Sequence, residues 1–475
     1  MKKLVHNFIY QAIYQITLIA LPIITIPVVS HSLGVDGVGF YNYILSIVTY
    51  FILFAGLGLA NYGVREIATV NDISQKDVLS KKFWELEIFN IIVAISVILL
   101  YFVFILFLPN KEYLIVSGIS LVATLFDISW FYQGIQNFKQ VSIVNLIVKL
   151  ISFILIILFI NSKEDLMLYF LIQSTSVLIS NMSLWLYLKK YIIFVKVGLK
   201  DSMKHFKPAL HYFIGKVSIT LYTTLNKTLL GVLSTTAVVG IYTSSLQLIT
   251  IMITLIGTVD MVLMPYMTRL VSENDEDRLL TILEKTIDLQ LFFSIPLMYG
   301  IILINEKLIP WFYGDSFSYL NKTVPFMATL VIIIPLGISI VRQYLFPLNK
   351  IREFNISVTI AAAIGIFLSV ILIPLVGVWG AILSTLISEI SVTGYRVYEL
   401  IKHTKFKFNV KRIILYFLCS MIMYIVTYYL TKDLNPNFIT TSIQVLVGVI
   451  IYMLGTYLLN TNQIVNYYMI RKIKE

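Results

Sequence analysis

The sequence is poor in charged side chains and almost lacks cysteine. Asp, Glu, Lys and Arg make up 13% of its 475 residues, against roughly 25% in soluble domains. With a mean hydropathy of +0.87, such a chain cannot cover its own surface in water. This composition excludes a soluble enzyme, a nucleic-acid-binding module and a disordered scaffold. The one cysteine, Cys419, lies in an apolar run and excludes a disulfide framework or a cysteine-built metal site.

What the sequence does contain is long apolar runs. A helix needs about 20 mostly apolar residues to cross the hydrocarbon core. Fourteen runs of that kind predict an all-α integral membrane protein. They are 10–30, 40–60, 86–108, 113–132, 140–160, 166–188, 210–230, 238–262, 286–305, 323–341, 355–374, 378–398, 413–431 and 438–459.

The positive charges alternate between the connectors. If the amino terminus is cytoplasmic, 28 of the 36 Lys and Arg residues fall in cytoplasmic connectors or tails. This bias is the one that orients membrane proteins, and it predicts that both termini are cytoplasmic. It also accounts for the net charge of +11 without a nucleic-acid partner, because basic loops meet anionic inner-leaflet lipid.

A weak internal repeat suggests the domain organisation. Val38-Gly39-Phe40-Tyr41 is expected to join the first two spans, and Val239-Gly240-Ile241-Tyr242 to join the seventh and eighth. Because transporters are commonly built from repeats with the site between them, we expect two six-helix lobes around a central cavity. The predicted parts are an N-lobe (1–188), a cytoplasmic linker (189–209), a C-lobe (210–398) and a C-terminal part (399–475) with a basic connector, a helix pair and a tail.

The seventh span carries a polar stripe. Tyr212, Lys216, Thr220, Thr223 and Lys227 recur at intervals of three or four residues, which places them on one helix face. The two lysines lie about 16 Å apart along the axis. A lipid-facing stripe of this kind would be very unfavourable, so it predicts a wet cavity.

Other spans repeat the pattern with different polar groups. Gln247 belongs to a stripe in the eighth span, and Lys149 lies near mid-membrane in the fifth. For the Ser and Thr stripes, helix–helix packing is the alternative, and Lys227 has the alternative of reaching the outer surface. Lysines in a cavity favour an anion such as phosphate. The deep carboxylates Asp127 and Glu389 are candidates for ion coupling or for a structural role.

Enzyme signatures are absent from the sequence. There is no glycine-rich phosphate loop, and the five histidines lack metal-ligand spacing. We therefore predict no catalytic residues, no metal site and no cofactor, and leave open a coupling to a proton or sodium gradient.

The chain resembles the polysaccharide-transporter (Wzx-type) flippases of the multidrug/oligosaccharidyl-lipid/polysaccharide exporter superfamily. The resemblance runs over essentially the whole chain and rests on short motifs in a fixed order. These are Leu33-Gly34-x-x-Gly37-x-Gly39-x-Tyr41, Asn61-Tyr62-Gly63-x-Arg65-Glu66, Asp127-x-x-Trp130-x-x-Gln133-Gly134, Leu230-Gly231, Val239-Gly240-x-Tyr242, Pro265 with Arg269, Pro347 with Lys350, and Gly377-x-x-Gly380-Ala381 with Glu389.

The resemblance implies alternating access in a bacterial cytoplasmic membrane. The implied substrate is an undecaprenyl-diphosphate-linked oligosaccharide, moved from the cytoplasmic to the outer leaflet for capsule, exopolysaccharide or O-antigen synthesis. A polymerase and glycosyltransferases are the implied partners. Lys149, Lys216 and Lys227, with Thr220, Thr223 and Gln247, are then the candidates for binding the headgroup.

Two other functions remain as alternatives. A multidrug or organic-cation exporter of the same fold would place carboxylates in its amino-terminal spans, and the first two spans here carry none. A membrane scaffold without transport activity would have no reason to hydrate its interior, which the polar stripes indicate.

Overall fold

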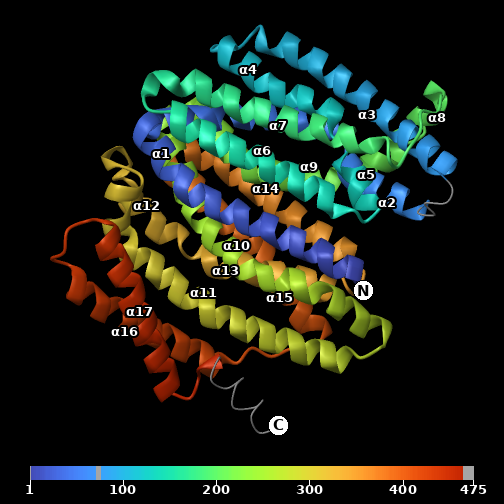
Figure 1. Ribbon diagram of the computed structural model, residues 1–475. Coiled ribbons are helices and arrows are strands. Elements are labelled where there is room, and N and C mark those ends of the chain that lie inside the picture. Colours follow the sequence, from blue (N-terminus) through green and yellow to red (C-terminus); the bar gives the residue numbers. More distant parts are fainter. Residues whose placement is uncertain (1, 71–75, 464–475) are drawn as a thin grey trace. The chain divides into compact units, whose positions relative to one another are not determined.

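The computed structural model describes the backbone of residues 2–70 and 76–463. Side chains are described over the same ranges, apart from those of residues 2–19, 214, 215, 222, 261 and 262. All regular structure in these ranges is helical, with α-helices joined by short 3₁₀ turns and one π turn (Figure 1). The predicted all-α membrane architecture is confirmed.

Packing divides the chain into two compact units, residues 1–239 and 240–475. The first unit contains α1 (Lys2–Gly56), α2 (Leu59–Thr69), α3 (Lys76–Ile105), α4 (Lys111–Val122), α5 (Ser129–Gly134), α6 (Phe138–Phe159), α7 (Leu166–Leu188), α8 (Leu199–Met203) and α9 (Phe206–Leu233). The second contains most of α10 (Thr236–Ser272), then α11 (Glu276–Phe312), α12 (Leu320–Met327), α13 (Leu330–Ile340), α14 (Ile351–Val376), α15 (Val378–His403), α16 (Val410–Thr431) and α17 (Phe438–Leu458). Helix α9 groups with the first unit because it packs against α1 and α2. The lobe boundaries at 188 and 210 come from a sequence repeat rather than from packing, and they stay a prediction.

The fourteen predicted spans all coincide with helical segments. Among the described residues, eleven stretches are long and apolar enough to cross a membrane, and one of them, Ala20–Thr69, holds the second predicted span and residues 20–30 of the first. The seventh and twelfth predicted spans are not among these stretches. They correspond to α9 and α15, helices of 28 and 26 residues. Hydropathy therefore located the helices. The structure differs from the prediction at two places, the link between the first two spans and the middle of the fourth span.

The link between the first two spans is one residue long. Helix α1 kinks at Gly34, whose φ of 65° lies in the left-handed region that glycine adopts without strain. The segment 38–41, predicted as the linking turn, is helical instead. The prediction was wrong by about one helical turn, because a single residue with positive φ changes the chain direction without a loop.

The fourth span is broken in the middle. After α4 come a 3₁₀ turn (Ala123–Phe126) and an extended Asp127, and only then α5. Four carbonyls at the break accept hydrogen bonds from side chains: Ala123 from Asn181 (2.8 Å), Thr124 from Asn90 (3.1 Å), Phe126 from Trp185 (3.0 Å) and Asp127 from Trp130 (2.9 Å). Irregular backbone at membrane depth is tolerated where protein groups replace the missing helical bonds.

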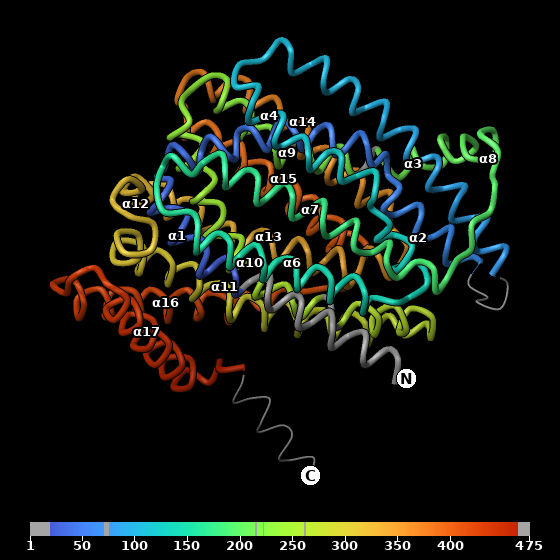
Figure 2. The backbone as a smooth tube through the Cα atoms, turned by 45° about the horizontal axis from the view of Figure 1, so that its top comes forward, coloured from blue at the N-terminus to red at the C-terminus, as the bar shows by residue number. Residues whose placement is uncertain are grey.

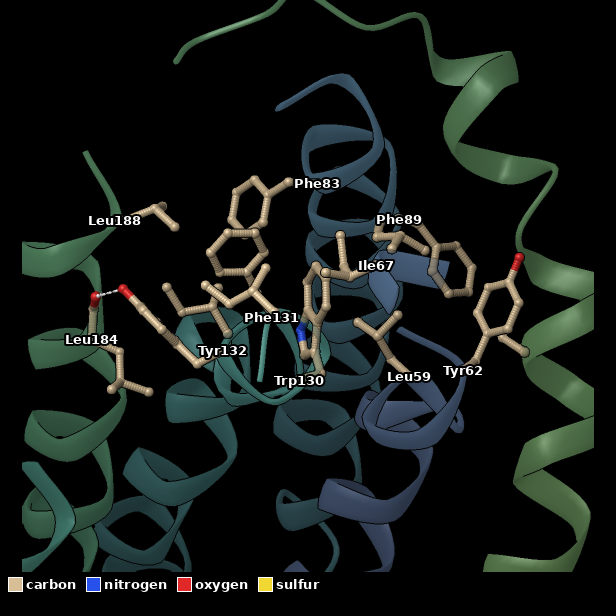
Figure 3. Close-up of a cluster of buried hydrophobic side chains, with 14 of the residues drawn as sticks. Leu59, Tyr62, Ile67, Phe83, Phe89, Trp130, Phe131, Tyr132, Leu184 and Leu188 are labelled. Atoms are coloured by element: carbon tan, nitrogen blue, oxygen red, sulfur yellow. Dashed lines mark hydrogen bonds between the residues drawn. The ribbon is translucent and has the colours of Figure 1, made fainter. Parts of the chain in front are cut away.

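An aromatic cluster locks the broken span onto α2 (Figure 3). Trp130 is 2% exposed and stacks on Phe83 with ring centroids 5.5 Å apart. A Cβ atom on Gly63 would lie 2.8 Å from the Trp130 ring, and one on Gly134 would lie 2.6 Å from the Ile67 side chain. The second and third family motifs of the sequence therefore meet each other in space.

The second unit contains a closely packed hairpin and an attached pair of helices. Helices α14 and α15 meet around Gly377, which has a φ of 57°. Helices α16 and α17 lie side by side (Figure 2) and both pack on α11. Near the start of α11, Arg412 donates to Asp288 at 2.8 Å; near its end, the Lys307 ammonium donates to the carbonyls of Lys432 (2.8 Å) and Leu434 (2.7 Å). Lys307 thus satisfies carbonyls at the carboxyl end of α16.

Replacing Lys307 with methionine is expected to loosen the C-terminal pair. The apolar side chain fills a similar volume but leaves two partly buried carbonyls without a donor, which costs about 1–3 kcal/mol per unsatisfied group. Thermal unfolding of the purified protein measures the loss. Lys322→Met, at an exposed position of the same unit, is the control. Equal unfolding midpoints for the two variants would contradict a stabilising role for the bonds from Lys307 to these carbonyls.

Candidate functional site

The candidate site begins with the polar face of α9. Ala209 and Leu230 are fully buried near the two ends of this face, whereas Lys216 and Thr223 between them are exposed. Thr220 and Lys227 on the same face are half-buried. The middle of the face is therefore not covered by protein, although both ends are. Because two ammonium groups are very unfavourable in hydrocarbon, this uncovered part requires water or an anion.

Helix α9 is held in place by hydrogen bonds and close packing within its unit. Arg65 donates to the Tyr212 hydroxyl at 2.6 Å, and Ser46 lies 2.8 Å from the Thr228 hydroxyl. A Cβ atom on Gly231 would lie 1.9 Å from the Tyr43 ring, so only glycine allows this approach to α1. These contacts fix the direction in which the polar face points.

Lys149 lies on a different helix of the same unit. Its neighbours on that face of α6, Asn145 and Ser152, hydrogen-bond to Ser180 and Ser176 of α7. Lys149 itself is exposed, and no hydrogen bond or ion pair is seen for it among the residues with described side chains. Helix α1 packs against both α6 and α9. The structure thus brings Lys216 and Lys227 onto one face and leaves Lys149 apart.

The stripe in the eighth span resembles that of α9. Gln247 is exposed on α10, as are Thr250 and Thr258. The threonine hydroxyls donate to carbonyls of their own helix, Thr250 to Leu246 at 2.8 Å and Thr258 to Leu255 at 2.8 Å. Neither stripe residue therefore uses its hydroxyl to bind a neighbouring helix.

Helix packing accounts for several polar side chains of the sixth and twelfth spans. In the sixth span, Ser176 and Ser180 form hydrogen bonds with Ser152 and Asn145 of α6. In the twelfth span, Thr385 lies 2.9 Å from the Tyr242 hydroxyl and Arg396 donates to Ser357 at 3.1 Å. The contacts of these side chains are those expected of helix–helix packing, the alternative to a wet cavity.

The two predicted deep carboxylates have different surroundings. Asp127 follows the break in the fourth span, where its Oδ1 accepts from the Ser129 amide at 3.0 Å, at the start of α5. Glu389 lies half-buried on α15. The Asp127 contact is structural in kind, and an ion-coupling role for either carboxylate stays a prediction.

A buried network anchors the start of α9. The His205 ring lies 2.7 Å from the Tyr62 hydroxyl through Nδ1 and 3.3 Å from Glu85 through Nε2. Lys204 pairs with the same carboxylate at 2.9 Å. Burial lowers the pKa of His205, and the Glu85 hydrogen bond opposes this shift only in part. The network ties α2 and α3 to the helix that carries the lysines.

The stability of the protein is expected to fall in mild acid through His205. A histidine with a lowered pKa binds fewer protons folded than unfolded, so its contribution to the unfolding free energy is present above the ordinary pKa of 6.5 and is lost as pH falls below it. Thermal unfolding from about pH 8 to about pH 5 tests this. His205→Gln should flatten the profile below the ordinary histidine pKa, and an unchanged slope in that variant would assign the acid sensitivity to other groups.

Sequence reasoning missed buried carboxylates inside the apolar runs, among them Glu87 of α3, at 0% exposure, and Asp260 of α10. Asp260 is 1% exposed, yet it stands two residues before the predicted end of the eighth span and was not singled out. Helix α10 continues to Ser272, so Asp260 lies well inside it. The signal was available in the sequence, because an aspartate inside a long apolar run is rare without a functional partner.

Comparisons with known proteins agree on one family and one fold. The sequence matches a family model described as "Polysaccharide biosynthesis protein" over residues 4–271. A relative from Escherichia coli (strain K12), named "Putative O-antigen transporter", is 28% identical over 241 residues, covering 49% of this chain and 57% of the relative. A relative of the same name from Shigella dysenteriae is 22% identical over 344 residues, covering 70% of this chain and 85% of the relative. The chain therefore spans little more than half of the first relative's length.

A solved structure shares the fold. "Lipid II flippase MurJ, inward closed conformation" superposes with a TM-score of 0.74 and 18% identity, covering 97% of this chain and 100% of that chain. At that identity the likeness concerns the fold alone. By their names the two relatives are transporters, which agrees with the prediction that the chain is not an enzyme.

Proposed function

Because the chain belongs to the family of polysaccharide biosynthesis proteins, as its motifs predicted, we propose that it is a flippase for a lipid-linked oligosaccharide. The substrate proposed is an undecaprenyl-diphosphate-linked repeat unit. It moves from the cytoplasmic to the outer leaflet of a bacterial cytoplasmic membrane, where it feeds capsule, exopolysaccharide or O-antigen synthesis. Both termini are proposed to lie in the cytoplasm.

The uncovered polar face of α9 is the observation that carries this proposal. Lys216 and Lys227 present two ammonium groups about 16 Å apart along one face, with Thr220 and Thr223 between them. An ammonium group binds phosphate as a compact point charge, and hydroxyls add hydrogen bonds to phosphate or sugar. A diphosphate joined to an oligosaccharide is a substrate of this chemistry.

The lipid part of the substrate needs no polar path. Large apolar side chains are exposed along many of the helices, among them Leu99 on α3 and Phe367 on α14, as expected of helices that face acyl chains. We propose that the polyprenyl chain stays in the bilayer while the headgroup passes along the lysine face. Lys149 and Gln247 are further proposed contacts along this route.

We propose alternating access as the means of passage, on the basis of the predicted two-lobe organisation. In this proposal the lobes at 1–188 and 210–398 rock about the substrate, and the remaining helix pair moves with α11, on which it packs. A polymerase and glycosyltransferases are proposed as functional partners, because they would consume and supply the repeat unit.

Depletion of the protein in its native host tests the function. Lipid-linked oligosaccharide is then assayed on each face of the cytoplasmic membrane, together with the surface polymer. The expected result is accumulation on the cytoplasmic face and loss of the polymer. Unchanged lipid-linked sugar with intact polymer, in a host without a second flippase, would contradict the proposal and make organic-cation efflux the next function to assay.

A further inference from the structure

Four polar side chains meet in the interior of the second unit. Asp260 of α10, Gln290 of α11, Ser339 of α13 and Gln343 of the π turn that follows α13 (Val341–Leu345) are between 0% and 7% exposed. None of them belongs to the lysine face. A π turn within a helix is rare and frequently marks a functional site.

The serine in this group has more acceptors than it can serve. Its Oγ lies 2.7 Å from Asp260 Oδ1 and 2.7 Å from Gln290 Oε1. A hydroxyl has one hydrogen and can donate to only one of them. The shortage disappears if the Gln290 amide is turned over, so that its nitrogen donates to Ser339 and the serine donates to Asp260. That arrangement leaves the Gln290 oxygen without a donor.

Further acceptors at the same place lack donors. Asp260 Oδ1 also accepts from Gln343 Nε2 at 2.6 Å, but the buried Asp260 Oδ2 and Gln343 Oε1 have no hydrogen-bond partner among the described side chains. The Gln290 amide nitrogen, as drawn, has none either. A buried carboxylate oxygen without a donor or cation is very costly. Two or three buried oxygens of this one group therefore lack a donor or cation among the described residues.

The neighbouring arginine donates to a backbone carbonyl and forms no salt bridge with the group among the described residues. Arg342, the residue before Gln343, donates through Nη1 to the Gly257 carbonyl at 3.3 Å. Within the described residues, no salt bridge of 4 Å or less is seen for Asp260. A proton on Asp260 would satisfy one oxygen of the group and leave the amide oxygens without donors. A metal ion can be shared by all of them.

We propose that Asp260, Gln290, Ser339 and Gln343 form a binding site for one sodium ion. The ligands are a carboxylate, two amide oxygens and a hydroxyl, all hard oxygen donors of the kind that alkali and alkaline-earth cations prefer. One carboxylate balances one monovalent charge, whereas a divalent ion would remain half-neutralised in this buried place. If the proposed transport function holds, this ion is a candidate to couple transport to a sodium gradient.

Thermal unfolding of the purified protein tests the site with sodium as the probe. The unfolding midpoint is measured in NaCl and in choline chloride at equal ionic strength and fixed pH. A ligand that binds only the folded state raises stability in a saturable way, so NaCl should raise the midpoint and choline chloride should not. Asp260→Asn should abolish the sodium-dependent rise. Asp277→Asn, which neutralises an exposed carboxylate on α11, should keep it.

A milder variant covers the case in which Asp260→Asn does not fold. Ser339→Ala removes one neutral ligand and should weaken sodium affinity by about tenfold or more, read from the NaCl concentration at half-saturation. Equal midpoints of the wild-type protein in the two salts would overturn the site. So would a full sodium response in a folded Asp260→Asn variant, or the same stabilisation produced by lowering pH without sodium.

The sodium site and the flippase proposal can fail separately. Sodium-dependent stabilisation is measured without any lipid-linked sugar, so it stands even if depletion in the host leaves surface polymer intact. Conversely, if depletion supports the flippase function but NaCl does not raise the unfolding midpoint, the proposed function stands and the sodium site is contradicted.

Discussion

Replacing Lys216 with alanine is expected to lower surface-polymer export by about tenfold or more, because the variant loses a charge-assisted contact to the substrate phosphate worth about 1.5–3 kcal/mol. The protein should still insert in the membrane, since the Lys216 side chain is exposed. The measurement is polymer yield in a depleted host complemented with the variant, normalised to the amount of protein in the membrane. Lys216→Arg keeps the charge and should retain most of the export.

Lys207→Ala is the matched control for this prediction. Lys207 is also exposed on α9, but nine residues before Lys216, which places it on the opposite side of the helix. Removing its charge should leave export near the wild-type level. Wild-type export by a well-expressed Lys216→Ala variant would remove that lysine from the proposed site, and equal losses in both variants would indicate a general effect of charge on α9.

Replacing Gly380 with alanine is expected to destabilise the second unit strongly. The added Cβ atom would lie 2.4 Å from the carbonyl carbon and oxygen of Leu372, which are backbone atoms that cannot rotate away. Overpacking of a close interface costs about 1–3 kcal/mol, occasionally more. A lower unfolding midpoint and less protein in the membrane are the expected observations.

Gly394 provides the control within the same helix. A Cβ atom there meets no atom within 4 Å, and alanine is favoured over glycine in a helix interior by about 1 kcal/mol. Gly394→Ala should therefore leave the midpoint unchanged or raise it. If Gly380→Ala unfolds at the wild-type midpoint, α14 and α15 are less closely packed than the structure shows.

Sequence reasoning located the membrane spans because a run of apolar residues is a local property. The fourteen predicted segments needed only length and hydropathy, and each coincides with a helical segment. The kink of α1 was placed about one turn too late, because a turn at one glycine leaves no polar loop to mark it. Gly34 stood in the family motif, but spacing alone could not show that it has positive φ.

The broken fourth span could not be predicted, because its causes lie on other helices. The donors that satisfy its carbonyls, Asn90, Asn181 and Trp185, are far from it in sequence. For the same reason, spacing could not separate stripes that pack, such as Ser176 and Ser180, from stripes that stay uncovered. The lysines of α9 were identified because charge in an apolar run is conspicuous.

The break in the fourth span also constrains how this protein can change. A continuous helix satisfies its own carbonyls, so its neighbours are free to vary. Here side chains of α3 and α7 donate to carbonyls of the break, and an apolar residue in place of Asn181 or Trp185 removes the side-chain donor to the Ala123 or Phe126 carbonyl. An apolar residue in place of Asn90 leaves the Thr124 carbonyl with the Asp127 amide alone, at 3.3 Å. Replacing all three residues should be tolerated if segment 123–128 also becomes regular helix. Replacing one of them alone should be tolerated poorly. These side chains lie on two helices, α3 and α7, and are therefore expected to change together in related sequences.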